Sequence, residues 1–538
     1  MKRVLIQKGM GKRAEQLLLF CLFAVLPSAL AAQDFTMRRG GCIISSATEN
    51  NTNTAETRSP KPFRLPAINK HWDANRIYKQ LVVLVSFAAD NTNFRSENPR
   101  EFYNNMLNTS GFNQRNGKGC MADYFREQSK GLFNVQFDVY GPYQVDYKAN
   151  PYEKPTIETK NQNTAPLTAA TKMLLTEHPE IDFSQYDWNN DNRVDQVIFI
   201  CAGYQGNVNH ELCYGYMWPF TSSFGSIATP DGKFISQFSV SCELWPNNTS
   251  VGISTISHEF CHCLGLPDIY PVPEWTYSAV DEWDLMDGGN FTNYGWCPPN
   301  CSPLEKMLLG WLTPVELTGP TTISGMKSTD EGGTVYLIKH TDNEYLLLEN
   351  RQWRGWDKGV PGKGLVIYHV NYIASKWSSN TVNGTENAPF NYSLISADNR
   401  SYDDWDVLCD LKGWSKYANK PWMNARHMSG APYPYVTDST EIVNELTDTS
   451  IPAARMINAN ENGSKMLMKP ITNITMSDDG LISFDFMGGN TTEMIVETRK
   501  VARPAACYRM NGLRAMARQG QGFYIIRLND GTVKKVFK

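Results

Sequence analysis

The segment SHEFCHCLGLPD, at residues 257–268, has the residue types and spacing in this chain that are best suited to chemistry. His258 and His262 are four positions apart, so on a helix both imidazoles lie on one face and can bind one Zn²⁺. Glu259 is one step round that helix, where its carboxylate can reach a metal-bound water and act as general base. The chain has only 8 histidines, so a chance HExxH is improbable. The alternative is an amphipathic helix with surface histidines.

The residues after the second histidine extend the motif to HExxHxxGxxD. Gly265 can adopt the left-handed conformation that ends a helix, which lets Asp268 approach the same metal as a third ligand. Three protein ligands leave a fourth position open to water, as in catalytic zinc sites. The alternative third ligand is a glutamate from a later helix, either Glu282 or Glu305. Asp268 is preferred because the glycine turn otherwise has no obvious purpose.

A second motif, EWDLMDGG, follows at residues 282–289. Met286 lies in this acidic and glycine-rich turn, where its side chain would suit an apolar floor beneath a histidine-bound metal. Taken alone, a methionine of this kind is more often part of an ordinary core.

Together these motifs resemble the metzincin clan, and more narrowly the immune inhibitor A-like secreted zinc metallopeptidases. The chain reads HEFCHCLGLPD where that family has a HEFGHxLGLPD segment, and DLMDGG and EKMLLGWL match its DLM turn and the GW element that follows. The resemblance extends upstream to GCMADYFREQSKGLF and downstream to LLLENRQWRGWDKGVPGKGLVIYHV, so it covers residues 78–375. Cys261 and Cys263 depart from the family pattern, and either core packing or a disulfide would explain them.

The resemblance implies a set of functional residues, namely the zinc ligands His258, His262 and Asp268, the base Glu259 and the Met turn at Met286. It implies a secreted zinc-dependent endopeptidase that hydrolyses peptide bonds of extracellular proteins through a metal-activated water. It does not assign a hydrogen-bond donor for the transition state. Tyr294, just after the Met turn, is a candidate, although an aromatic residue in a glycine-rich loop is more often structural. Two alternatives are an inactive zinc-containing adhesin or glycan-binding module, which would not need the base, and a different zinc hydrolase.

The stretch DWNNDNRVD places oxygen ligands at alternating positions. They are Asp187, Asn189, Asp191, the Arg193 carbonyl and Asp195. Alternating carboxylates and amides can wrap a hard cation, so this loop is predicted to bind Ca²⁺. It is not an EF-hand, because it lacks the glycine and the bidentate glutamate of that motif. The alternative is a solvated turn that leads into the strand QVIFICAG.

The elements that must position these residues follow from the hydrophobic pattern. Short β-branched runs predict strands at residues 80–87 and in FNVQFDVYG, QVIFICAG and FISQFSVSCEL, and residues 121–131 predict a helix with a glycine stop. The alternation of strands and helices indicates a mixed α/β catalytic domain over residues 77–312. From its position, FISQFSVSCEL is a candidate edge strand for aligning an extended peptide.

The helical signal fades over residues 313–490, where runs such as TVYLIKH, EYLLLENR, GLVIYHV and LISFDFMG predict a β-sandwich. Residues 402–470 within it are irregular and receive no assignment. Residues 491–538 end in two short strands around an Asn-Asp-Gly turn. The expected fold class is α+β, with a metzincin-like catalytic domain (a mixed twisted sheet plus the zinc-site helix), a β-sandwich and a short C-terminal β tail.

Composition indicates a folded protein with two or three domains, since the 538 residues are 41% hydrophobic and include 14 Trp, 25 Tyr and 24 Phe. A net charge of -4 with interspersed signs gives no basic field for nucleic acid. The expected partners are therefore protein or peptide substrates.

The N-terminus has the features of a secretory signal peptide. Residues 1–32 have a basic start, an apolar run too short to span a bilayer and small residues at the end. No later segment supplies an integral membrane span, so the protein is expected to be secreted, in the medium or at the cell surface. Residues 33–76 form a pro-segment or linker rich in Asn, Thr, Ser and Pro. Cys42 within it is a candidate latency thiol that would bind the open zinc position, or an incidental disulfide partner.

The C-terminal tail contains CYRMNGLRAM followed by GFYIIRLNDGTVKKVFK. It resembles the type A sorting domains of the type IX secretion system. The resemblance implies that the tail is an address for the export machinery and takes no part in catalysis.

Overall fold

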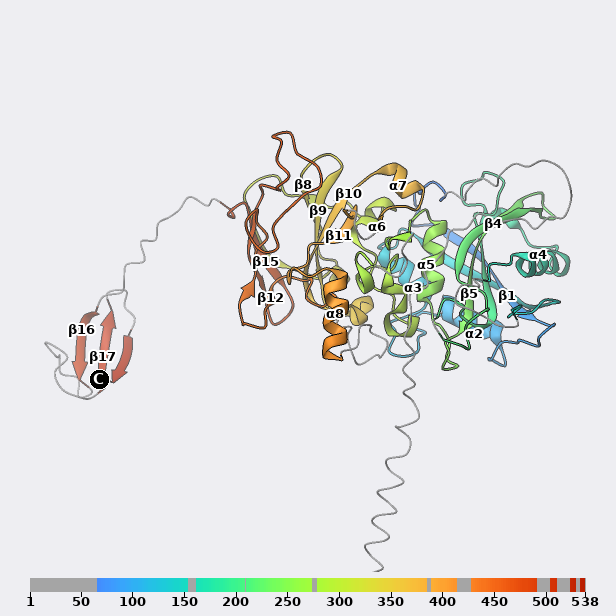
Figure 1. Cartoon of the computed structure of the whole chain (residues 1–538), viewed down its shortest axis with the longest axis horizontal. Coiled ribbons are helices and arrows are strands. Elements are labelled where there is room, and N and C mark those ends of the chain that lie inside the picture. Colours follow the sequence, from blue (N-terminus) through green and yellow to red (C-terminus); the bar gives the residue numbers. More distant parts are fainter. Residues whose placement is uncertain are drawn as a thin grey trace, which may run out of the picture.

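The computed structural model describes residues 65–152, 161–208, 210–272, 278–384, 389–413 and 427–490, and the backbone of three strands between residues 504 and 537. The expected signal peptide, residues 33–64 of the expected pro-segment, and Cys42 lie outside these residues. The described chain is a mixed α/β protein with several sheets and few helices, which is compatible with the α+β class (Figure 1). Its helices are all too short or too polar to cross a membrane.

The first part of the chain is built on a five-stranded sheet with the order β2-β1-β3-β5-β4. Its strands are β1 (Ile77–Phe87), β2 (Asn134–Val145), β3 (Val197–Tyr204), β4 (Phe220–Ala228) and β5 (Phe234–Leu244). Four of them run parallel, and β4 is antiparallel to β5. The stretch FISQFSVSCEL is β5, which pairs on both sides, so the expectation that it is an edge strand is wrong. The β4–β5 hairpin places β4 outside β5, and β4 is the edge.

Helices cover both faces of this sheet. They are α2 (Pro99–Asn108), α3 (Met121–Gln128), α4 (Ala165–Glu177), α5 (Ser254–Cys263) and the 3-10 turn η1 (Phe183–Tyr186). Along β1, Val82 and Leu84 point into the core formed with α2, α3 and α5, whereas Leu81 and Val83 point into the core formed with α4 and η1. Because both faces are buried, the strand reads as one continuous apolar run. The helix expected at 121–131 is α3, which ends before Gly131 turns the chain at a φ of 82°.

The second part of the chain contains two further sheets, with the orders β11-β10-β9-β8-β6 and β14-β15-β7, and a small hairpin of β12 and β13. The strands are β6 (Val315–Glu316), β7 (Thr321–Met326), β8 (Tyr336–Lys339), β9 (Glu344–Arg351), β10 (Gly364–Asn371), β11 (Tyr392–Leu394), β12 (Tyr435–Val436), β13 (Ile442–Val443), β14 (Ile471–Met476) and β15 (Ile482–Phe486). Leu348 and Ile367 of one sheet share a core with Ile482 and Phe484 of the other. Two helices, α7 (Ala374–Ser378) and α8 (Tyr402–Lys412), lie where the helical signal of the sequence was weak.

The two parts of the chain pack directly on each other through β10. Leu365 and Ile367 point toward the β14-β15-β7 sheet. Val366, Tyr368 and Val370 point the other way, into the core that contains α5. The sheet of β9 and β10 is therefore a middle layer, and one hydrophobic core continues across residue 312.

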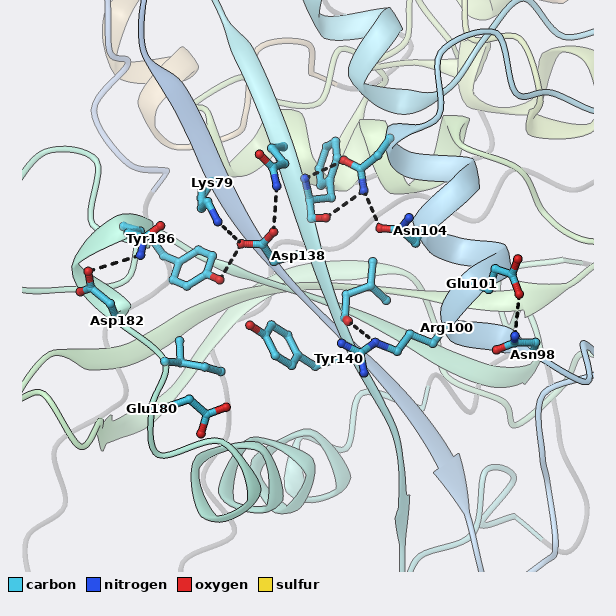
Figure 2. Close-up of a pocket in the computed structure, with 16 residues that line it drawn as sticks. Lys79, Asn98, Arg100, Glu101, Asn104, Asp138, Tyr140, Glu180, Asp182 and Tyr186 are labelled. Carbon is cyan, nitrogen blue, oxygen red and sulfur yellow. Dashed lines mark hydrogen bonds and ion pairs between the residues drawn. The ribbon is translucent and has the colours of Figure 1, made fainter.

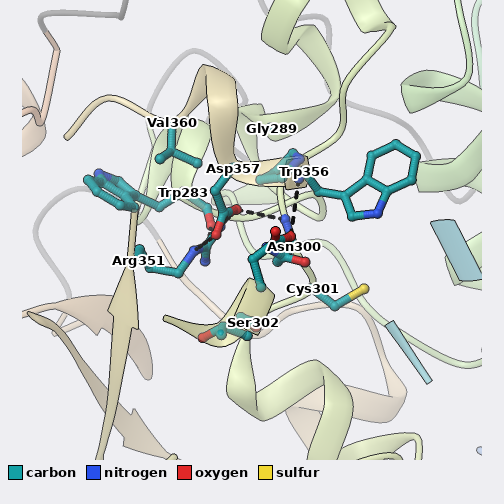
Figure 3. A network of polar contacts seen from close by, with 12 residues as sticks. Trp283, Gly289, Asn300, Cys301, Ser302, Arg351, Trp356, Asp357 and Val360 are labelled. Carbon is teal, nitrogen blue, oxygen red and sulfur yellow. Dashed lines mark hydrogen bonds and ion pairs between the residues drawn. The ribbon is translucent and has the colours of Figure 1, made fainter. Parts of the chain in front are cut away.

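A buried ion-pair network lies at this junction (Figure 3). Arg351 is fully buried, and its guanidinium donates from Nε to Asp357 Oδ2 (2.7 Å) and from Nη1 to Glu349 Oε1 (2.9 Å). Nη1 also lies 3.3 Å from the carbonyl oxygen of Trp283. Asp357 in turn accepts the N–H of Asn300 at 2.9 Å. The network therefore ties β9 to two segments of the first part of the chain.

The tail forms a separate three-stranded antiparallel sheet of β16 (Pro504–Arg509), β17 (Phe523–Leu528) and β18 (Val533–Phe537). The two strands expected around the Asn-Asp-Gly turn are β17 and β18. The first strand, β16, was not expected.

The nine cysteines whose side chains are described are free thiols. Eight are buried and Cys263 is half-buried, so the disulfide considered for Cys261 and Cys263 is not formed. Burial raises the pKa of Cys120, Cys213 and Cys297 to about 12, which keeps these thiols protonated and unreactive.

We therefore expect iodoacetamide to leave these nine thiols largely unmodified in the folded protein and to alkylate all of them in urea. Peptide mapping by mass spectrometry would measure both states, and Cys263 should be the first to react. Fast labelling of Cys201 in the native protein, or disulfide-linked peptides among the nine, would contradict the structure.

A buried carboxylate within the second part of the chain predicts a pH dependence of stability. Glu344 is fully buried, lies 2.7 Å from His369 Nε2 and accepts the N–H groups of Ile457 (2.6 Å) and Asn458 (2.9 Å). Burial opposes its charge, but these partners outweigh burial and lower the pKa of Glu344 to about 2. The carboxylate therefore stabilises the fold above the unfolded-state pKa of about 4.3, and this stabilisation is lost as the pH falls toward 2.

We expect Glu344→Gln to be less stable than the wild type at pH 6. The difference should shrink as the pH falls below about 4.3, because the wild-type carboxylate then begins to lose its advantage. Urea unfolding over a pH series measures this difference, and a gap that stays constant down to pH 3 would refute the role of the charge.

Candidate metal centre

The end of α5 turns the chain back toward the two histidines of the helix. Gly265 has a φ of 100°, and its N–H donates to the carbonyl of His262 (2.9 Å) while Leu266 N–H donates to that of Cys261 (3.0 Å). A Cβ at Gly265 would lie 2.7 Å from Cγ1 of Ile68. Only glycine satisfies both the backbone conformation and this close approach. The turn lets the following residues return to the helix face.

Asp268 returns to the two histidines of α5, as the spacing predicted. Its Oδ1 lies 3.3 Å from His258 Nε2 and 3.2 Å from His262 Nε2, and all three side chains are buried. Their ligand atoms lie within 4.8 Å of one another. Among the described residues, no other group of three or more His, Cys, Asp or Glu side chains converges in this way. The group could hold a metal ion.

The hydrogen bond made by Nδ1 of each histidine determines the tautomer of the ring. Nδ1 of His258 lies 2.7 Å from the carbonyl oxygen of Leu285, and Nδ1 of His262 lies 2.8 Å from that of Leu266. A carbonyl oxygen can only accept, so Nδ1 carries the proton in both rings. The Nε2 atoms of the neutral rings therefore present lone pairs to the shared space, as metal-ligating imidazoles do.

The three facing atoms fit a cation. When both rings are neutral, two Nε2 lone pairs face Asp268 Oδ1 across a buried space, and apart from one another these three atoms have no hydrogen-bond partner among the described residues. Without a metal, the carboxylate attracts a proton. Burial disfavours the imidazolium, but Asp268 outweighs burial and raises the pKa of His262 to about 9. Burial would raise the pKa of Asp268, but the two imidazoles hold it well below its usual range.

Glu259 lies on α5 between the two histidines in sequence and is buried. Thr221, on the edge strand β4, places its hydroxyl 2.9 Å from Oε2 and 3.0 Å from the carbonyl oxygen of this glutamate. The contact orients the carboxylate that was predicted to be the base. Thr221 was not identified from the sequence, because only the sheet order brings β4 to the helix.

The turn around Met286 contacts the segments that carry the histidines and Asp268. Its N–H donates to Asp284 Oδ1 (2.8 Å), and its carbonyl oxygen accepts the N–H of Ile269 (2.8 Å). Leu285, the neighbour, supplies the carbonyl that holds His258. The Met286 side chain is fully buried in the core that includes α5. The turn thus contacts both the helix and the segment that carries Asp268.

The alternative third ligands lie outside the converging group. Glu305 caps α6 (Pro303–Leu308) by accepting the N–H of Ser302 at 2.6 Å, and burial together with neighbouring Asp284 raises its pKa well above the usual value. Glu282 is buried in the 3-10 turn η3 (Asp281–Trp283). Asp268 is therefore the carboxylate that the fold brings to the histidines.

Tyr294 lies in the turn η4 (Gly288–Gly295) with a φ of 56°. Its ring lies 4.6 Å beneath the Arg115 guanidinium, and its carbonyl oxygen accepts Nε1–H of Trp245 at 2.9 Å. These contacts hold the loop in place. The role of its hydroxyl in the transition state stays a prediction.

The side-chain oxygens of the loop predicted to bind Ca²⁺ already accept hydrogen bonds from backbone N–H groups of the loop. The residues concerned are Asp187, Asn189, Asp191, Arg193 and Asp195. Asp187 accepts the N–H groups of Asp191 and Asn192 at 3.0 Å and forms an ion pair with Lys233 at 2.8 Å. Burial, Asp191 and Asp187 raise the pKa of Asp195 to about 7. The loop carboxylates form no converging group among the described residues, and a cation there would compete with Lys233.

A cavity of about 850 Å³ lies elsewhere, between α2, β2 and residues 180–186 (Figure 2). Its polar groups bind one another. Asp138 accepts from Lys79 (3.1 Å) and Tyr186 (2.8 Å), and the Asn108 amide pairs with the backbone N–H and carbonyl of Phe137 (2.9 and 2.8 Å). The two Asn108 bonds occupy backbone groups of Phe137 and so hinder pairing of another strand with β2 at that point. The His-His-Asp group is instead next to β4, at the opposite edge of the sheet.

No protein-family model matches this chain, and no curated protein is significantly similar to it. A function therefore has to be inferred from the candidate metal centre itself. The features that bear on it are the buried His-His-Asp group, the glutamate beside it on the same helix and the nearby edge strand.

Proposed function

We propose that the chain is a secreted zinc-dependent endopeptidase of the metzincin type, similar to the immune inhibitor A-like metallopeptidases. The observation that carries this proposal is the buried convergence of His258, His262 and Asp268, with Glu259 on the same helix. A purely structural metal site would not need a carboxylate base beside its ligands. The extended motif and the Met turn, both quoted above, support the same class.

Zinc is the proposed metal because two imidazoles and one carboxylate form a common catalytic zinc set that keeps a position open. When bound, Zn²⁺ polarises the scissile carbonyl and lowers the pKa of a coordinated water toward about 7. His258, His262 and Asp268 would hold it. Their Nδ1–H bonds to backbone carbonyls keep both rings in the ligating tautomer.

Glu259 performs the proton transfers in this proposal. It accepts a proton from the attacking water and delivers it to the leaving amine when the peptide bond breaks. Thr221 holds the carboxylate through its hydroxyl. The burial of the base strengthens these interactions because water screens them little.

The edge strand β4 is the proposed aligner of the substrate. It carries Thr221, which contacts Glu259, and among the described strands it pairs only with β5. An extended peptide that adds to its outer edge would therefore pass the catalytic group. This assigns to β4 the role that the sequence suggested for β5. We also propose that the tail at residues 491–538 serves export. The loop at residues 187–195 would bind Ca²⁺ only if the cation displaced the Lys233 ammonium from Asp187.

Metal removal tests the proposal. We expect the processed protein to cleave casein, to lose this activity after treatment with 1,10-phenanthroline, and to regain it with stoichiometric Zn²⁺ but not with Mg²⁺. Gel electrophoresis of the digest and elemental analysis of the protein measure the two results. A protein that contains zinc and cleaves no protein or peptide would favour the adhesin or another zinc hydrolase.

A further inference from the structure

A loop from the second part of the chain reaches the metal centre. Asn380 follows α7, and its Nδ2 donates to Asp268 Oδ2 at 2.7 Å. Its Oδ1 accepts the N–H of Asp268 at 2.6 Å. One carboxamide thus holds both the backbone and the carboxylate of the aspartate, from 112 positions further along the chain. Both side chains are buried.

These bonds give the two carboxylate oxygens of Asp268 different roles. Oδ2 is held by Asn380, and Oδ1 faces the Nε2 atoms of His258 and His262. A carboxylate that is free to rotate could turn either oxygen, or both, toward a metal. With Oδ2 held, Oδ1 is the oxygen presented to the space between the rings. Partners of this kind orient ligands before the metal binds.

The loop that carries Asn380 is itself held by other asparagines. Asn383 Nδ2 donates to the carbonyls of Ile269 (2.7 Å) and Tyr392 (2.9 Å). Asn391 Nδ2 donates to the carbonyl of Val382 at 2.7 Å. Asn371, at the end of β10, donates from Nδ2 to Asn391 Oδ1 at 2.9 Å. These buried amides connect β10 to the segment of the third ligand, so the loop position depends on the middle sheet.

We propose that Asn380 is a positioning residue of the metal centre and that the second part of the chain thereby completes the site. The inference rests on one part of the proposed function, namely that the His-His-Asp group binds Zn²⁺, and it does not require peptidase activity. Its rival is a purely structural role, in which Asn380 joins two parts of the core and has no influence on metal binding.

Zinc affinity of the processed protein, measured by competition with a chromophoric chelator, tests the proposal. Asn380→Gly removes both hydrogen bonds and tolerates the φ of 56° at this position. We expect it to lower the affinity for Zn²⁺ by about 10- to 100-fold. Asn473→Gly is the matched control, because Asn473 has a φ of 55° and donates to Asp485 at 2.8 Å, away from the centre. It should leave the affinity unchanged.

A double-mutant cycle with Asp268→Ala separates positioning from a general effect on folding. If Asn380 acts through the aspartate, Asn380→Gly should cause little further loss of Zn²⁺ affinity in the Asp268→Ala background. Wild-type affinity in Asn380→Gly, or an equal loss with and without Asp268, would overturn the proposal. A wild type that binds Zn²⁺ without cleaving casein would refute the peptidase function alone, and one that binds no metal would refute both.

Discussion

Glu259→Gln is expected to lower kcat/KM for casein cleavage by about 10²- to 10⁴-fold. Glutamine has the same shape and keeps an oxygen that can accept from the Thr221 hydroxyl, which lies 2.9 Å from Oε2 in the wild type. It cannot take a proton from water at neutral pH. The zinc content should be unchanged, because Glu259 is outside the converging ligand group. Initial rates and elemental analysis on the same preparation measure both quantities.

The matched control is Glu331→Gln, which makes the same chemical change at an exposed glutamate paired with Arg354. It should have wild-type activity. If Glu259→Gln kept more than a tenth of the wild-type rate with full zinc occupancy, another group would have to be the base. If it lost zinc, the carboxylate would have to be assigned to metal binding.

The local part of the site could be predicted from the sequence because helix geometry sets it. A spacing of four residues places His258 and His262 on one face of α5, and a left-handed glycine returns the chain so that Asp268 faces them. Each of these relations spans about a dozen residues at most. The choice of Asp268 over Glu305 also followed from the turn, and the structure uses Glu305 to cap α6.

The contacts that complete the site could not be predicted, because they depend on the order of strands and the packing of layers. Thr221 reaches Glu259 only because β4 lies outside β5 in the sheet. The sequence pattern of β5 does not show which strands pair with it. Asn380 reaches Asp268 only because the sheet of β9 and β10 packs on the core of α5. The change in sequence pattern near residue 312 predicts a domain boundary there. The hydrophobic core, however, continues across that point.

Arg351→Met is expected to lower the free energy of unfolding by about 3–5 kcal/mol. The guanidinium is fully buried and neutralises Asp357 and Glu349, which are also buried. Methionine fills much of the same space but removes the guanidinium that binds both buried carboxylates, which leaves the buried Lys306 as the nearby cation. Since the network joins β9 to Asn300 and Trp283, unfolding should become easier for both parts of the chain together. Urea unfolding followed by fluorescence and circular dichroism measures the change.

Two further variants show whether charge or packing causes this loss. Arg354→Met changes an exposed arginine paired with Glu331 and should cost less than about 1 kcal/mol. Adding Glu349→Gln and Asp357→Asn to Arg351→Met removes the uncompensated charges while keeping their shapes, so it should recover part of the stability. If the triple variant is as unstable as Arg351→Met alone, the arginine acts through packing, because neutralising the two carboxylates would then have gained nothing.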